Sequence, residues 1–367
     1  MSDYPKDLFI LEGISLLCFN KDYTQCALSK KDQHIYIYEV PNIMDTKTWK
    51  HIHTLSNHSL FISGLDWSPV TNQILSCSHD KTSYVWKYEG DKWIFDNVVA
   101  TLKVSFLFCH WNKRGDKFVE GTGNKNLFIG YYSEENKWWA TKAIRNHKRT
   151  SVVCAAIDPT SLFVISGATD MKVYITSCYI SEIDDKHLTE ETKLLTQDFG
   201  TVVYQLDAGG WLINCEWSLD GNFAYASSQN GYIYAIDYKQ DKTTSIPINH
   251  CPATFIVPVS INGFYAVGYD REIYYYEENA GKWMIKKAIT EKKTKEERKD
   301  NEDDERTAGV SEALKKMNSQ QKRSKASLIV TMEQNENAHA TMISSVTVKG
   351  SDMITSDLAG FIKYWKL

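Results

Sequence analysis

The sequence lacks three features that would assign it to other classes of protein. It has no CxxC pair, and its eight cysteines are scattered among apolar runs, which indicates buried free thiols in a reducing compartment rather than disulfides or a zinc site. It has no run of eighteen apolar residues, and the apolar run near the N-terminus is too short for a signal peptide. Its formal net charge is −4, without the positive excess of a general nucleic-acid binder. We therefore expect a soluble cytoplasmic protein that binds proteins, not nucleic acid, and does not insert into membranes.

Short apolar runs separated by regular turns repeat along most of the chain. Each copy has an apolar triplet, a polar turn, a second run of small apolar residues, a turn and an alternating aromatic strand. The copies begin at or near Cys18, Leu65, Cys109, Ala155, Cys215, Phe255 and Ile343. The turns before the aromatic strands contain Asp32, Asp80, Asn124, Asp170, Asn230, Asp270 and Asp357. Most neighbouring turns lie roughly 40 to 48 residues apart, which is the period of a four-stranded propeller blade.

Seven such copies predict an all-β fold, a seven-bladed β-propeller that forms a single domain over residues 1–367. The period-two alternation in HIYIYEV and SYVWKY places one face of each strand against the next blade. The chain ends on the third strand of the last copy, so we expect residues 7–13, DLFILEG, to supply its fourth strand. Two longer gaps predict one insertion between blades 4 and 5 at residues 180–208, and a charged, partly helical, partly disordered one between blades 6 and 7 at residues 286–326.

Signature residues of one propeller family occur at several of these turns and strands. His58, Asp80, Trp86 and Trp365 stand where WD-repeat proteins carry such residues. A serine near them, Ser76 or Ser78, would complete a Ser-His-Asp set, but no nucleophile elbow accompanies it. We therefore interpret His58, Asp80 and Trp86 as a buried structural hydrogen-bond network.

A longer segment carries a more specific resemblance. EENKWWATKAIRNHKRTSVVCAAIDP, residues 134–159, followed by CYISEID from Cys178, resembles the WD-repeat subunit of the actin-related protein 2/3 complex. HIYIYE at His34, GLDWSP at Gly64 and YVW at Tyr84 are similar to the same family. The resemblance covers nearly the whole chain and includes the positions of both long gaps.

The resemblance implies a non-catalytic structural and binding subunit in a complex that nucleates branched actin filaments. Its partners would be the other subunits, the actin filament and acidic nucleation-promoting factors, and it would be found in the cytoplasm, in actin-rich cytoskeletal structures. It needs no cofactor of its own, because nucleotide is bound by the actin-related subunits of that family. The alternative is another WD-repeat adaptor, such as a substrate receptor of a ubiquitin ligase, although no recruiting domain is visible in the sequence.

A basic cluster, RNHKRT, lies just before a predicted strand. Arg145, Lys148 and Arg149 either form a solvated loop or contact an acidic partner, toward whose carboxylates arginine offers a bidentate geometry. Arg149 is the position that matches the arginine of the family motif.

The second insertion has two parts of different composition. Residues 291–306 contain no apolar residue, which is typical of a disordered or loosely helical segment. Val310, Ala313, Leu314 and Met317 then follow at i, i+3, i+4 and i+7, which predicts one apolar stripe on a short helix. Such a helix either docks on its own propeller or meets a partner, and the resemblance implies that the partner is actin.

The remaining motifs predict no chemistry. His51 and His53 lie near His58, but three histidines without further ligands fit no closed zinc pattern. Gly121 and Gly123 are turn glycines, since no helix follows that could bind a phosphate. The DFG string at residues 198–200 lacks the other motifs of a kinase. We expect no enzyme activity and no metal.

Overall fold

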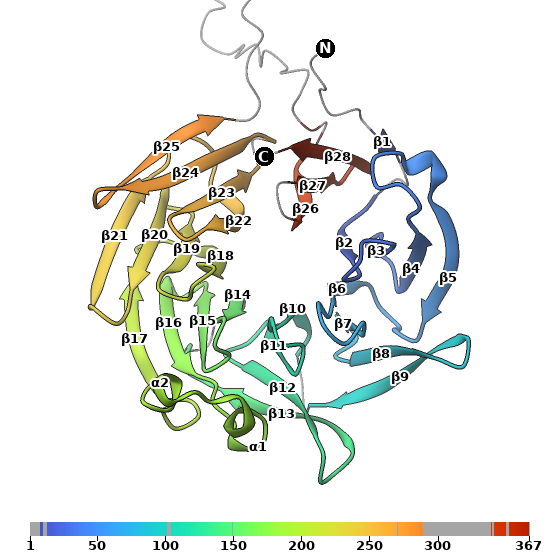
Figure 1. The fold of residues 1–367 in the computed structure, drawn as a ribbon, viewed down its shortest axis with the longest axis horizontal. Coiled ribbons are helices and arrows are strands. Elements are labelled where there is room, and N and C mark those ends of the chain that lie inside the picture. The colour runs from blue at the N-terminus through green and yellow to red at the C-terminus, as the bar shows by residue number, and fades with distance from the viewer. Residues whose placement is uncertain are drawn as a thin grey trace, which may run out of the picture. The chain divides into compact units, whose positions relative to one another are not determined.

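The computed structural model describes residues 8–9, 13–100, 104–148, 150–269, 271–288, 339, 341–349 and 352–366. Tertiary contacts divide the chain into two units, Met1–Ile289 with His339–Leu367, and Thr290–Ala338. All described residues belong to the first unit, which is a ring of small β-sheets (Figure 1). It is the seven-bladed β-propeller that the repeated sequence pattern predicts.

Blades 1, 4, 5 and 6 are separate four-stranded antiparallel sheets whose strands follow chain order. Blade 1 contains β2 (Leu16–Phe19), β3 (Gln25–Ser29), β4 (His34–Glu39) and β5 (Lys50–Ser56), with the short 3-10 helix η1 (Thr46–Thr48) before β5. Blade 4 contains β14 (Val152–Ile157), β15 (Phe163–Ala168), β16 (Lys172–Ser177) and β17 (Val202–Asp207). Blade 5 contains β18 (Leu212–Trp217), β19 (Ala224–Ser228), β20 (Tyr232–Asp237) and β21 (Lys242–Pro247). Blade 6 contains β22 (Ala253–Ser260), β23 (Gly263–Gly268), β24 (Ile273–Asn279) and β25 (Lys282–Ala288).

Blades 2 and 3 join into one eight-stranded sheet. Blade 2 contains β6 (Ile62–Trp67), β7 (Ile74–Ser78), β8 (Ser83–Glu89) and β9 (Lys92–Val99). Blade 3 contains β10 (Phe106–Trp111), β11 (Lys117–Thr122), β12 (Leu127–Ser133) and β13 (Trp138–Ile144). Their outermost strands pair in parallel, with Trp139 opposite Val98 and Ala140 opposite Val99. The two edges therefore cover each other at these positions, where one blade meets the next at the rim.

The last blade combines strands from the two ends of the chain. It contains β26 (Ile343–Lys349), β27 (Asp352–Asp357), β28 (Phe361–Lys366) and β1 (Leu8–Phe9). Leu8 lies opposite Ile362 and Phe9 opposite Phe361 in an antiparallel pairing. The fourth strand of this blade thus comes from within residues 7–13, and Figure 1 shows β1 beside β28.

The first insertion lies elsewhere than predicted. Its helices, α1 (Ser181–Asp184), η2 (Asp185–His187) and α2 (Glu190–Lys193), connect β16 to β17 inside blade 4, and do not lie between blades 4 and 5. The prediction was wrong because it followed the first three strands of each copy, and β17 is a half-exposed outer strand with a weak apolar pattern.

Within the described ranges, no helix is long and apolar enough to cross a membrane. The second insertion begins no earlier than residue 289, because residues 286–288 still belong to β25.

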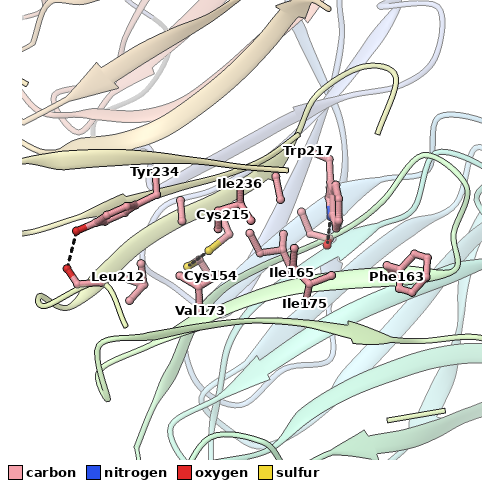
Figure 2. Packing of buried hydrophobic residues seen from close by; sticks show 14 of the residues in the cluster. Cys154, Phe163, Ile165, Val173, Ile175, Leu212, Cys215, Trp217, Tyr234 and Ile236 are labelled. Atoms are coloured by element: carbon pink, nitrogen blue, oxygen red, sulfur yellow. Dashed lines mark hydrogen bonds between the residues drawn. The ribbon is translucent and has the colours of Figure 1, made fainter. Parts of the chain in front are cut away.

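Apolar side chains from neighbouring blades form the core. Between blades 4 and 5, a cluster that includes Ile165, Val173, Leu212 and Trp217 is buried between the two sheets (Figure 2). The Trp217 indole Nε1 donates to the Ala156 carbonyl oxygen at 2.9 Å, so the polar end of this ring also finds a partner across the seam. Full burial of one such apolar side chain is worth about 1.5–3 kcal/mol. The repeated strand pattern therefore stabilises the ring by burying one blade against the next.

Candidate interaction surface

One face of the propeller carries the turns that contain the register residues. The strands of every blade alternate in direction, so the turns between second and third strands lie on one face, together with the connections that lead to the next blade. A series of backbone hydrogen bonds links neighbouring turns on this face. It includes Ile62 N to Asp32 O at 2.9 Å, Gly123 N to Ser105 O at 3.1 Å, Thr169 N to Ser151 O at 3.1 Å and Gln229 N to Trp211 O at 2.9 Å. We call this side of the propeller the turn face.

The basic cluster lies on the turn face, in the connection from β13 to β14. Arg145 and Lys148 are exposed, whereas Arg149 lies outside the described residues. The histidine of the cluster, His147, is only 2% exposed, so it is not part of the exposed basic surface. His147 turns inward because the blade uses it in a hydrogen-bond network.

A network of buried polar groups fixes the turn of blade 2. His58 Nε2 lies 2.8 Å from Ser76 Oγ, and the Trp86 indole Nε1 donates to the same oxygen at 2.8 Å. His58 Nδ1 lies 3.3 Å from Asp80 Oδ2, which also accepts from the Ser59 amide at 2.7 Å. Burial lowers the pKa of His58 although the Asp80 carboxylate opposes this shift. The geometry leaves Ser76 fully buried between an indole and an imidazole, where no substrate could reach it.

Two further blades contain networks that the sequence analysis did not identify. In blade 4, His147 Nδ1 lies 3.1 Å from Asp170 Oδ2 and its Nε2 lies 3.0 Å from Ser166 Oγ. In blade 7, His339 contacts Asp357 at 3.1 Å and Thr355 at 2.6 Å, and the Trp365 indole donates to the same threonine at 2.7 Å. The sequence feature that could have revealed these two networks is a histidine that lies 23 or 18 residues before the turn aspartate.

Large apolar side chains are also exposed on the turn face. Leu60 and Trp211 are each 52% exposed, Phe61 is 42% exposed and Met171 is 41% exposed. All four lie in blade-to-blade connections or in a turn between second and third strands. They do not follow the strand period, so sequence periodicity gave no sign of them. Exposed apolar residues of this size beside basic groups are typical of a surface that binds another protein.

The histidines and glycines considered for metal or phosphate binding occupy strands and turns in the described part of the chain. No three His, Cys, Asp or Glu side chains there are grouped so that they could hold a metal ion. His51 and His53 lie on β5 in a register that shifts between them. Gly121 belongs to strand β11 and not to a turn, and a Cβ there would lie 2.0 Å from the Phe108 ring. Gly200 adopts a φ of +86° in the turn before β17, so the DFG string is part of a connection.

A central cavity of about 460 Å³ is lined by the innermost strands of the blades. Asp66, His110 and Glu216 line it, and His110 Nδ1 lies 4.0 Å from Asp66 Oδ2. Burial raises the pKa of Asp66, and it raises the pKa of Glu216 to about 7.

Cysteines line the cavity as well, and seven of the eight thiols are buried. Cys251 is the exception to the predicted burial, because it lies in the exposed connection between β21 and β22.

Comparison with known proteins agrees with this architecture. The family model "WD domain, G-beta repeat" matches residues 49–87 and 139–177. The chain is 30% identical over 286 residues to the actin-related protein 2/3 complex subunit 1A of Arabidopsis thaliana, an alignment that covers 77% of this chain and 75% of that protein. It is 28% identical over 288 residues to subunit 1A-A of Xenopus laevis, with 76% of each chain covered, and 26% identical over 273 residues to subunit 1 of Schizosaccharomyces pombe, with 72% and 71% covered. The chain belongs to the family of subunit 1 proteins of the actin-related protein 2/3 complex.

Proposed function

We propose that the chain is a non-catalytic structural and binding subunit of the actin-related protein 2/3 complex and supports the nucleation of branched actin filaments in the cytoplasm. The observation that carries this proposal is the 30% identity to a subunit 1A protein over three quarters of both chains. The other subunits of the complex would be its constant partners. A complex-forming role also agrees with the exposed apolar residues of the turn face, which need a partner to be buried.

Affinity purification of the tagged chain followed by mass spectrometry tests the proposal. We expect the two actin-related proteins and the remaining subunits to co-purify at stoichiometric levels. Recovery of cullin adaptors in their place would overturn the proposal and favour the substrate-receptor alternative.

The turn face is suited to acidic partners, such as the acidic tails of nucleation-promoting factors. Lys31, Lys81, Arg145 and Lys148 are exposed on it, and none of them forms an ion pair with another described residue. In contrast, Asp80 and Asp170 on the same face are occupied by histidines and turn amides. Both carboxylates keep their negative charge but are mostly buried, whereas the four cationic side chains are exposed, and these would attract a negatively charged peptide most strongly at low salt.

Charge reversal tests the basic part of this surface. Arg145→Glu with Lys148→Glu should weaken binding of an acidic activator peptide steeply at low ionic strength and leave the melting temperature unchanged. Lys21→Glu with Lys113→Glu is a matched control, because both lysines are exposed in turns between first and second strands, on the opposite face. Equal affinities of the two variants at every salt concentration would show that the cluster is only a solvated loop.

The second insertion is proposed to meet actin in the existing filament. Val310, Ala313, Leu314 and Met317 lie outside the described residues, so this proposal stands on the sequence pattern and the family. Leu314→Asp with Met317→Asp should reduce co-sedimentation with filaments and the rate of branching but leave assembly of the complex and thermal stability unchanged. A lower melting temperature with undiminished co-sedimentation would indicate instead a helix that packs within its own protein.

A further inference from the structure

Cys154 and Cys215 hold their sulfur atoms 3.0 Å apart across the seam between blades 4 and 5. Cys154 belongs to β14 and Cys215 to β18, which are the innermost strands of their blades. Figure 2 shows the two sulfurs facing each other within the apolar cluster. Both are free thiols, and a disulfide bond is about 2.05 Å long, so an approach of about 1 Å would form one.

The neighbouring residues leave room for this pair. Gly167 lies beside it, and a Cβ at that position would lie 2.8 Å from Cys154 Sγ and 2.7 Å from Leu212 Cβ. Any side chain at position 167 would therefore displace the sulfur or the leucine. The glycine allows the two inner strands to bring their thiols into contact.

A small oxidant can reach the two sulfurs through the central cavity. Both cysteines line the central cavity of about 460 Å³, and they are only 5% and 2% exposed. Hydrogen peroxide is close to water in size, so it can enter this cavity. Burial raises the pKa of the Cys215 thiol, so Cys215 keeps its proton and the more exposed Cys154 meets the oxidant first.

We propose that Cys154 and Cys215 form a redox-sensitive site at which hydrogen peroxide makes a disulfide that links blade 4 to blade 5. The Cys154 sulfur attacks one peroxide oxygen, the O–O bond breaks, and the second oxygen leaves as water with the thiol proton. The product at Cys154 is a sulfenic acid. The Cys215 sulfur then displaces its hydroxyl, which leaves as a second water with the Cys215 proton. Two thiols are oxidised, and one peroxide is reduced to two molecules of water.

The disulfide would change the stability of the propeller without changing its fold. It would join two residues that are 61 positions apart, and so would restrict the unfolded chain. We therefore expect oxidation to raise the melting temperature by roughly several degrees, reversibly with dithiothreitol.

Peptide mapping of the full chain tests the proposal directly. Trypsin releases residues 150–172 and 194–239, each of which contains one cysteine, so a linked pair of these peptides after peroxide treatment and thiol blocking identifies the bond. Cys178→Ser, a buried thiol that donates to the Ser161 carbonyl oxygen, is the matched control and should keep both the linked peptide and the thermal shift. Cys154→Ser and Cys215→Ser should lose both, and alanine at either position serves if a serine variant does not fold. Intact thiols, a sulfinic acid at either residue, or a different linked pair in the wild-type protein would overturn the proposal.

Discussion

The Lys117 ammonium lies 2.8 Å from Asp184 Oδ2, and both side chains are fully buried. Lys117 belongs to β11 of blade 3, whereas Asp184 ends helix α1 of the insertion in blade 4. Asp184 also accepts from Arg114 and, at 2.7 Å, from the Ile180 amide. This ion pair therefore connects the insertion to the neighbouring blade through a site that water does not reach.

Asp184→Ala should destabilise the protein strongly, because it leaves the buried Lys117 ammonium without its counter-ion. The expected loss in the free energy of unfolding is about 3–5 kcal/mol, measured by chemical denaturation. Asp185→Ala, at the exposed neighbouring position, should cost much less. Replacing the pair together, with Lys117→Met and Asp184→Leu, should recover part of the loss, and a double variant no more stable than Asp184→Ala would contradict this account.

Trp86→Phe should cost about 1 kcal/mol for the lost hydrogen bond from the indole to Ser76. Some further loss should follow from the smaller ring in the buried site. Trp138→Phe is the control, since Trp138 is 48% exposed and lies on the rim strand β13. Thermal melting of the two variants tests this expectation. Equal shifts in melting temperature would mean that the hydrogen-bond network does not contribute to stability.

Glu120 should make the stability of the protein depend on pH. Burial raises the pKa of this carboxyl to about 8, while the Ser83 hydroxyl, which donates to it, opposes the shift. The folded protein therefore keeps the proton between about pH 4.5, where the unfolded chain loses it, and about pH 8. The stabilisation that comes from this proton is complete below the lower pH and falls by up to about 1.4 kcal/mol per pH unit as the pH rises through this window.

Glu120→Gln should remove that dependence and gain stability, relative to the wild type, as the pH rises from 5 to 8. Denaturation curves at several pH values measure the difference in the free energy of unfolding between this variant and the wild type. Glu135→Gln, at an exposed position, is the control and should show no such trend. A constant difference between wild type and Glu120→Gln at all pH values would refute a buried, protonated Glu120.

Deletion of residues 1–12 should lower the melting temperature and promote aggregation. It removes β1, so the outer edge of β28 would lose its pairing at Ile362 and Phe361 and become open to other chains. Size-exclusion chromatography together with thermal melting measures both effects. A truncated chain that stays monomeric with an unchanged melting temperature would mean that β1 does not hold the last blade.

The sequence by itself determined the repeat, the blade number and the family. Strands such as HIYIYE alternate with a period of two, and turns with Asp or Asn recur at blade spacing, so local chemistry alone reveals them. The same local pattern identified His58, Asp80 and Trp86, and it identified Arg145 and Lys148 as basic residues of one connection.

Only the tertiary structure decided which groups meet across blades, because those contacts join residues with no regular spacing in the sequence. The pairing of β9 with β13, the burial of His147 and the contact of Lys117 with Asp184 are of this kind. So is the contact between Cys154 and Cys215, whose separation of 61 residues includes an insertion that breaks the repeat. A periodic pattern indicates which face of a strand is buried. The residue that this face contacts in the neighbouring blade depends instead on how the closed ring positions one sheet against the next.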